Sequence, residues 1–145
     1  MKFWDSSAVV PLLLAERASD GLLALLARDP EMTVWWGATV ELSSALARRE
    51  REKALSSEGV KGALDRLRSL ARSWSEVNPV EAVRAVASRL VRVHPLRAGD
   101  ALQIAAAIVA SEYQPDSLAI VSLDDRLSEA AEREGFTVDR GPAVT

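Results

Sequence analysis

The segment that most constrains the fold is residues 118–123, an apolar run followed at once by Asp124. A strand that is apolar on both faces is typical of a parallel sheet covered by helices on both sides. Shorter runs of β-forming residues lie at 2–4, 32–36, 75–77 and 136–138. Because segments with helical periodicity separate these runs, the chain is predicted to consist of βαβ units.

The sequence therefore predicts an α/β fold with three layers, α/β/α, around a central parallel sheet of about four or five strands. Its 145 residues are typical of one domain. We expect that domain to cover residues 1–140 and residues 141–145 to be a loose C-terminal tail. The predicted helices cover residues 8–14, 18–28, 39–53, 58–74, 79–93, 100–111 and 125–134. Ser6 and Ser7 are expected to cap the first of them.

Composition narrows the chemistry that is available. The chain has no cysteine and one histidine, His94, which argues against thiolate metal sites, multi-histidine zinc sites and histidine-based triads. The absence of cysteine, of a signal-peptide pattern and of a long apolar run predicts a cytoplasmic protein without a membrane segment. A net charge of −3 argues against a simple electrostatic nucleic-acid binder. Catalysis would depend on oxygen ligands and a hard metal.

Four acids occupy positions that such chemistry needs. Asp5 ends the first predicted strand, and Glu41 follows the second. Asp124 follows the apolar run 118–123, and Asp100 precedes a run of alanine, leucine and isoleucine that would otherwise bury it. Asp100 alone could simply favour the positive end of a helix dipole. The carboxyl ends of parallel strands, however, meet at one edge of a sheet, where open α/β sheets bind ligands.

Carboxylates that gather at one edge repel one another unless a cation neutralises them. Magnesium, or manganese in its place, is the natural occupant of an oxygen-lined site of this kind. A bound ion of this type activates water and stabilises charge on a phosphoryl oxygen. The four acids therefore predict metal-dependent cleavage of a phosphodiester.

The same residues carry a family resemblance. The stretch Trp4-Asp5-Ser6-Ser7, Glu41 in an early helix, the stretch 100–107 and the stretch 121–127 occur in an order and spacing similar to those of PIN-domain proteins. The chain most resembles the short VapC-type toxins of toxin–antitoxin pairs, over nearly its whole length. The resemblance implies a magnesium-dependent endoribonuclease that a cognate antitoxin inhibits. Family members usually form homodimers.

The resemblance also implies roles for single residues. Asp5, Glu41, Asp100 and Asp124 correspond to the catalytic acids, and Asp5, Asp100 and Asp124 among them to the metal ligands. The small hydroxyl positions beside the acids correspond to Ser7 and Ser122. Arg97 is a candidate for contact with an RNA phosphate because it lies three residues before Asp100, although an ion pair with an acid is an equal alternative.

Some positions stay open at this stage. Asp125 adjoins Asp124 and could be a helix N-terminal charge or a further acid of the site. Of Trp35 and Trp36, we expect one in the core and one partly exposed, with RNA stacking or a partner contact as the alternative. The charged run at residues 48–53 is predicted to be a solvated helix end, with contact to an RNA backbone as the alternative. His94, next to a proline, is interpreted as a turn residue.

Two other functions are compatible with an acidic sheet edge. A phospho-acceptor signalling domain also gathers acids and magnesium there, but it needs a lysine near the site. The chain has only Lys2, Lys53 and Lys61, none of which follows a late strand. A PIN-like module that binds a protein partner and no longer cleaves RNA is the second alternative, and the complete set of acids argues against it.

Overall fold

The computed structural model describes residues 1–143 and contains one five-stranded sheet. All pairings are parallel, and the strand order is β3-β2-β1-β4-β5. The strands are β1 (Lys2–Trp4), β2 (Met32–Trp35), β3 (Ser75–Val77), β4 (Ala119–Val121) and β5 (Val138–Asp139). The predicted α/β fold is confirmed, with five strands in the sheet.

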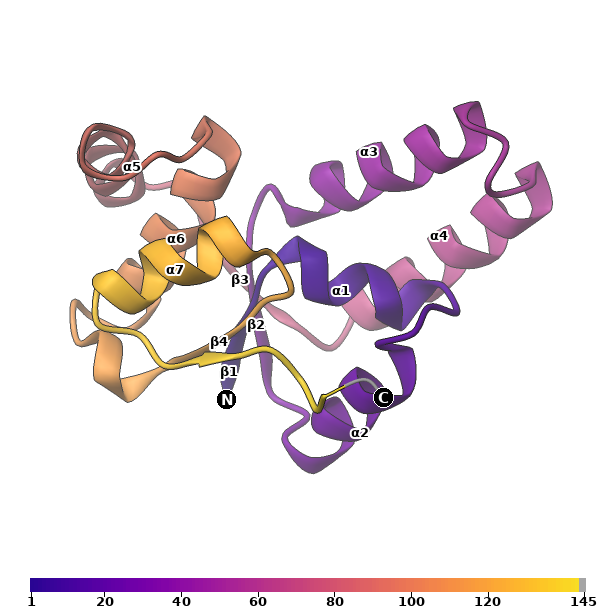
Figure 1. The fold of residues 1–145 in the computed structure, drawn as a ribbon, viewed down its shortest axis with the longest axis horizontal. Coiled ribbons are helices and arrows are strands. Elements are labelled where there is room, and N and C mark those ends of the chain that lie inside the picture. The colour runs from indigo at the N-terminus through magenta and orange to yellow at the C-terminus, as the bar shows by residue number, and fades with distance from the viewer. Residues whose placement is uncertain (144–145) are drawn as a thin grey trace.

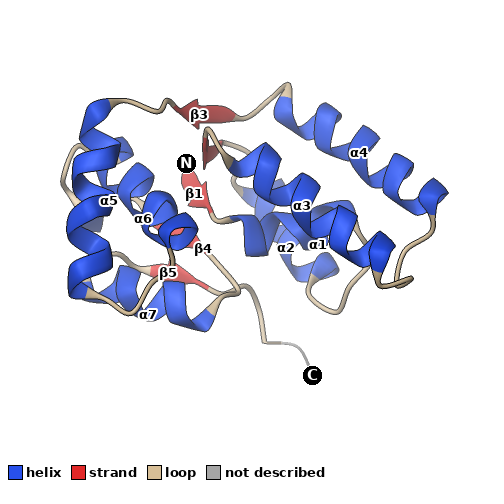
Figure 2. Cartoon of the chain, turned by 90° about the horizontal axis from the view of Figure 1, so that it is seen from above, coloured by secondary structure: helices blue, strands red, loops and turns tan. Residues whose placement is uncertain are grey.

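Helices cover both faces of this sheet. They are α1 (Ser6–Leu13), α2 (Ser19–Arg28), α3 (Ala38–Arg51), α4 (Ser57–Ala71), α5 (Glu81–Val93), α6 (Ala98–Ala110) and α7 (Asp125–Arg133). Helices α1–α4 gather on one side of the strands and α5–α7 on the other (Figure 2). The helices α3 and α4 run side by side and extend away from the sheet (Figure 1).

The alternation of side chains along each strand divides the core in two. Phe3 and Ile120 pack among the residues of α5, α6 and α7, whereas Trp4 and Val121 pack among those of α1–α4. All four side chains are fully buried, which is the pattern expected for central parallel strands. The apolar run 118–123 therefore serves both layers, as the sequence predicts.

The structure corrects the predicted start of three helices, one of which is α6, since it begins at Ala98 rather than at Asp100. Helix α1 begins at Ser6, two residues earlier than expected, and Asp5 occupies the N-cap position without a side-chain capping bond. Ser6 and Ser7 therefore lie inside the first turn, where the hydroxyl of Ser7 is free to bond Asp5. Helix α5 begins at Glu81, so Pro79 precedes the helix rather than opening it. Val80 has an extended backbone and is the N-cap residue, so the helix begins two residues later than predicted.

The strand order creates a switch point between β1 and β4. From β1 the chain builds outward through β2 and β3 on one side, and it later returns to place β4 and β5 on the other. Ligands of open parallel sheets bind at the carboxyl ends of the strands that flank such a point. Here those ends lead directly to Asp5 and Ser122.

The chain end beyond β5 packs partly on α2. The backbone N–H of Gly141 donates to the Asp139 carboxylate at 2.9 Å, and the ring of Pro142 lies against Gly21. The predicted loose tail extends to residues 144 and 145, which lie outside the described residues. Within residues 1–143, no helix combines the length and the apolar character needed to cross a bilayer.

Candidate active site

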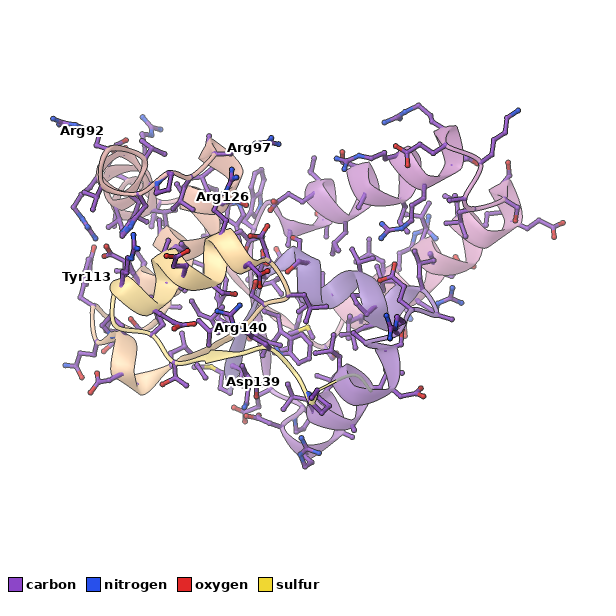
Figure 3. All side chains as sticks on the ribbon, viewed as in Figure 1. Arg92, Arg97, Tyr113, Arg126, Asp139 and Arg140 are labelled. Carbon is purple, nitrogen blue, oxygen red and sulfur yellow. The ribbon has the colours of Figure 1, made fainter. Side chains whose placement is uncertain are left out.

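A cavity of about 610 Å³ opens beside the switch point. We call it the acidic cavity, and its lining residues are Glu41, Arg48, Arg97, Gly99, Asp100, Asp124, Asp125 and Arg126. Three of the four predicted catalytic acids are therefore in its wall. Figure 3 labels Arg97 and Arg126, two of the basic side chains that share this wall.

The fourth acid, Asp5, is buried behind the lining. Its backbone N–H donates to the Val121 carbonyl at 3.0 Å, which links the ends of β1 and β4. Its carboxylate Oδ2 accepts hydrogen bonds from the hydroxyls of Ser7 and Ser122, the latter at 2.9 Å. Burial raises the pKa of Asp5, the two hydroxyls oppose that rise, and the charges of Asp124 and Asp100 add to it.

The two serine hydroxyls are oriented by the loop that follows β4. Ser7 Oγ accepts from the backbone N–H of Leu123 at 3.0 Å, and Ser122 Oγ accepts from that of Asp124 at 3.1 Å. Each hydroxyl thus accepts from the backbone and donates its own proton to Asp5. Ser7 and Ser122 lie beside the first acid, where the resemblance places them.

Glu41 is held by a residue that the sequence analysis did not single out. Gln103 Nε2 donates to Glu41 Oε1 at 2.8 Å and to Ser6 Oγ at 3.0 Å. Burial raises the pKa of Glu41 to about 7, with a further contribution from Asp5. Gln103 follows Asp100 by three residues, so both lie on one face of α6. A polar residue in an otherwise apolar run was the available signal for it.

Asp100 stands in the first turn of α6. Burial raises its pKa, the charge of Asp124 adds to the rise, and the guanidinium groups of Arg97 and Arg126 oppose it. The arginines are near enough to influence Asp100, but neither forms an ion pair with it among the described residues.

Asp124 and Asp125 face different surroundings. Asp124 caps α7, because its Oδ1 accepts from the backbone N–H of Leu127 at 2.8 Å. The Asp125 side chain is 96% exposed and pairs with Arg140 at 2.9 Å. The charge of Asp124, not that of Asp125, acts on Asp5 and Asp100. The geometry therefore favours Asp124 as the acid of the site.

Asp5, Glu41, Asp100 and Asp124 share one property across the described part of the chain: none of them forms an ion pair with an arginine, lysine or histidine. Burial with mutual repulsion and without a cation is the arrangement that a hard metal ion relieves. Residues 1–143 contain no group of three acidic or histidine side chains close enough to hold an ion by themselves. Magnesium does not require one, because it binds through one or two carboxylates, several waters and substrate phosphates.

Three further residues, two tryptophans and the histidine, have positions that agree with the sequence analysis. Trp35 is buried and Trp36 is 51% exposed, and their rings meet edge to face at 6.4 Å. His94 ends α5, where it is buried and its Nε2 lies 2.7 Å from Glu134. The basic residues Arg48 and Arg126 were not predicted individually as site residues. Arg48 follows Glu41 by seven residues, a spacing that repeats on one helix face and was therefore readable.

Comparison with known proteins identifies the family. No protein-family model matches the sequence. The chain is 31% identical over 145 residues to ribonuclease VapC45 of Mycobacterium tuberculosis strain CDC 1551 / Oshkosh, with 94% of this chain and 92% of the relative covered. Ribonuclease VapC49 of Mycobacterium tuberculosis strain H37Rv matches at the same identity and coverage.

Two solved structures share the fold. FitAcB from Neisseria gonorrhoeae superposes with a TM-score of 0.66 at 17% identity, covering 95% of this chain and 96% of that one. VapBC2 from Rickettsia felis, bound to a DNA fragment from their promoter, superposes with a TM-score of 0.66 at 11% identity, covering 97% and 98%. Together with the identity to the two mycobacterial ribonucleases, this fold confirms the resemblance: the chain belongs to the VapC family and has its PIN-like fold.

Proposed function

We propose that the chain is a magnesium-dependent endoribonuclease and the toxin of a toxin–antitoxin pair. The observation that carries the proposal is the set of four acids around the switch point, all without an ion-pair partner among residues 1–143. The two similar mycobacterial proteins are named ribonucleases, which supports RNA as the substrate. RNA and magnesium are both cytoplasmic, and we propose that location for the chain.

In this proposal Asp5, Asp100 and Asp124 hold the ion, and manganese can replace magnesium. The bound ion supplies an activated water and stabilises charge on the phosphoryl oxygens. Ser7 and Ser122 fix one oxygen of Asp5, so its other oxygen, Oδ1, keeps its orientation. Gln103 fixes one oxygen of Glu41 in the same way. Arg97 contributes positive charge next to Asp100, where it is available to an RNA phosphate.

The test is cleavage of total RNA by antitoxin-free protein, with magnesium or with excess chelator. We expect discrete fragments from the wild type, and a loss of roughly a thousandfold or more for Asp100→Asn. Asp125→Asn is the matched control, because this neighbouring acid is exposed and paired with Arg140. Cleavage by Asp100→Asn at the wild-type rate, or wild-type cleavage in chelator, would refute the proposed chemistry.

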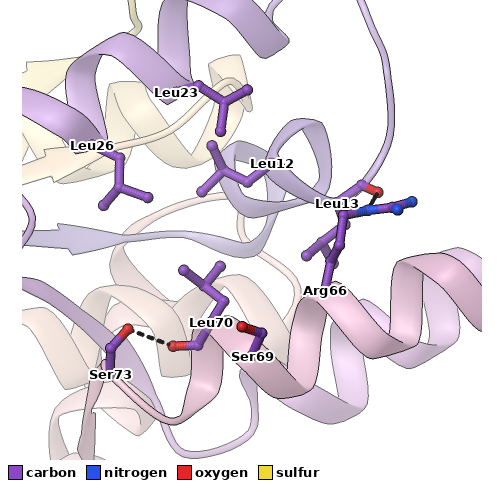
Figure 4. Close-up of a pocket in the computed structure, with 8 residues that line it drawn as sticks. All are labelled: Leu12, Leu13, Leu23, Leu26, Arg66, Ser69, Leu70 and Ser73. Carbon is purple, nitrogen blue, oxygen red and sulfur yellow. Dashed lines mark hydrogen bonds between the residues drawn. The ribbon is translucent and has the colours of Figure 1, made fainter.

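The proposed antitoxin contact is an apolar groove within the helical layer that α1–α4 form. It has a volume of about 320 Å³ and lies among α1, α2 and α4 (Figure 4). Leu12, Leu23, Leu26 and Leu70 give it an apolar floor, and Leu23 is 48% exposed. An apolar side chain of the antitoxin would bury this surface. Leu23→Glu should weaken the complex at least tenfold in a binding assay while RNA cleavage stays unchanged.

A homodimer is the remaining part of the proposal. Val91 and Val93, near the end of α5, are 43% and 60% exposed, and Val40 on α3 is 68% exposed. Exposed apolar side chains of this kind are available to a second copy of the chain. Sedimentation velocity of the purified protein should give twice the chain mass of 15.7 kDa. Val91→Lys should shift the sedimenting species toward one chain mass.

No structural feature favours the signalling alternative. None of the residues that line the acidic cavity is a lysine, and the Lys2 ammonium is paired with Asp139. Phosphorylation by acetyl phosphate should therefore not occur. Mass spectrometry after incubation with acetyl phosphate and magnesium would detect it.

A further inference from the structure

Three arginines line the acidic cavity and come from three parts of the chain. Arg48 lies on α3, Arg97 is the N-cap residue of α6, and Arg126 lies in the first turn of α7. All three side chains are exposed. The basic residues thus surround the acids from different walls of the cavity rather than from one helix face.

None of these arginines is in an ion pair within the described part of the chain. Neighbouring arginines on the same helices behave differently: Arg49 on α3 pairs with Glu16, and Arg133 on α7 pairs with Glu129. Guanidinium groups that lie beside acids without bonding them keep their five donors for another acceptor. Phosphate is the acceptor whose geometry they match best.

The spacing assigns the arginines to different phosphates. Arg48 follows Glu41 by seven residues, which is about 10 Å along the axis of α3. Arg48 therefore lies beyond the acids on the α3 side of the cavity, whereas Arg126 lies on the α7 side. A phosphate held among the acids would have Arg48 and Arg126 on its two sides.

Arg126 also belongs to a second, smaller cavity. This cavity, of about 150 Å³, is lined by Arg126 together with His94, Pro95, Glu129, Ala130 and Arg133. Arg126 is thus common to both cavities, and a strand that leaves the acidic cavity over α7 meets the second one next. On the α3 side, Arg48 is the residue proposed to contact the RNA beyond the acids.

We propose that Arg48 and Arg126 bind the phosphates that flank the scissile phosphate, so that single-stranded RNA crosses the acidic cavity from α3 to α7 and continues over α7 into the second cavity. The proposal rests on the proposed ribonuclease function and adds the path of the substrate to it. Arg97, next to Asp100, faces the scissile position itself. It follows that a substrate with a single phosphate uses neither Arg48 nor Arg126.

The test measures binding of a fluorescein-labelled 12-nucleotide oligouridylate by anisotropy in EDTA over a range of salt concentrations. We expect Arg48→Ala and Arg126→Ala each to weaken binding about tenfold at low salt. Each should also lower the slope of log K against log salt by about 0.7, the value for one phosphate contact on a single strand. Competition by the dinucleotide UpU should be the same for both variants and the wild type.

The control is Arg28→Ala. Arg28 is exposed like the others, but it ends α2 immediately before β2 begins and so lies at the opposite edge of the sheet. Its affinity and salt slope should equal those of the wild type. Unchanged slopes for both Arg48→Ala and Arg126→Ala, or an equal loss for Arg28→Ala, would overturn the proposed path.

An assay of total RNA cleavage with magnesium distinguishes a failure of the proposed RNA path from a failure of the proposed ribonuclease activity. A wild type that cleaves RNA, together with arginine variants that match it in binding and in rate at limiting RNA, refutes the path and leaves the ribonuclease intact. A wild type that neither binds the oligouridylate nor cleaves RNA refutes both. Thermal unfolding of the variants should match that of the wild type, because all three side chains are exposed.

Discussion

The cluster of four acids at the switch point and the single acid Glu134 have opposite electrostatic surroundings. Glu134 is mostly buried at the end of α7, where Arg89 lies 2.7 Å from one carboxylate oxygen and His94 lies 2.7 Å from the other. Its hydrogen bond with Arg89, and that with His94, lower the pKa of Glu134. Burial and mutual repulsion instead raise the pKa values of Asp5, Glu41 and Asp100.

The two sites differ both in burial and in cations: burial is the largest cause of the raised pKa at Asp5, Glu41 and Asp100, whereas the hydrogen bond from Arg89 is the largest influence on the pKa of Glu134. Glu134 stays charged at little cost because a basic side chain, Arg89, pairs with it. The acids at the switch point cost stability when they are charged, because none of them has an ion-pair partner among residues 1–143 and Arg97 and Arg126 offset the cost only in part at Asp100. Acids that destabilise the metal-free protein are expected at functional sites. Here the lack of ion-pair partners among the described residues leaves the acids available to a divalent ion.

The largest expected effect is on RNA cleavage. Asp5→Asn should lower cleavage by roughly a thousandfold or more, because it removes one of the proposed ligand charges. Glu134→Gln should leave the rate per folded molecule within about twofold, because Glu134 does not line the acidic cavity. Initial rates on total RNA, normalised to the folded fraction, check both. Equal losses in the two variants would show that Glu134 and the acids at the switch point are not functionally distinct.

The sequence predicts the positions of these acids better than their environments. Asp5, Glu41 and Asp124 were assigned to the sheet edge because each follows a strand, and β1, β2 and β4 form where expected. Asp100 was assigned because an acid heads an apolar helix. Those assignments need only local sequence patterns together with the general rules of parallel sheets, so a single sequence is enough to make them.

The side chains that hydrogen-bond to these acids are not predictable from such patterns. Gln103 reaches Glu41 across 62 positions of the chain, and Ser122 reaches Asp5 across 117. Such contacts depend on how α6 and β4 pack against the first strand, which periodicity does not specify. The pairing of His94 with Glu134 was missed for the same reason, since 40 positions separate the two residues.

The next largest effect is on the free energy of unfolding. The sign of the change should differ between Glu134 and the acids at the switch point. Glu134→Gln removes charge-assisted hydrogen bonds from Arg89 and His94, and it should lower the free energy of unfolding by about 1–3 kcal/mol. Asp5→Asn, in metal-free buffer at pH 8, should raise it by on the order of 1 kcal/mol, because a buried charge is removed. Urea denaturation of both variants measures the two changes. A loss of stability in Asp5→Asn would contradict the comparison.

The pH dependence of stability should also differ in sign. The pKa of Glu41 is raised from 4.5 to about 7 on folding, so the native state binds more protons than the unfolded state between these values. Metal-free stability therefore falls as pH rises through that window, and Glu41→Gln should flatten the fall. The pKa of Glu134 is lowered, so its contribution is present above about 4.5 and is lost as pH falls. Urea midpoints between pH 4 and pH 8 test both directions.

The smallest effect is expected at Asp125. This acid also lines the acidic cavity, but it is exposed and pairs with Arg140, and its charge is not among those that raise the pKa of Asp5 or Asp100. Asp125→Asn should change stability by less than about 0.5 kcal/mol, as most exposed ion pairs do. Its rate of RNA cleavage should equal that of the wild type. A loss of activity in this variant would bring Asp125 into the site and Asp124 into question.

The most direct test of the central claim is thermal unfolding with and without magnesium at pH 8. If the acids at the switch point hold the ion, magnesium at about 100 times its dissociation constant should stabilise the wild type by about 2.7 kcal/mol. Glu134→Gln should gain the same increment from its lower starting point, whereas Asp5→Asn and Asp100→Asn should gain little. An equal magnesium increment in all four proteins would contradict the account, because the ion would then bind elsewhere.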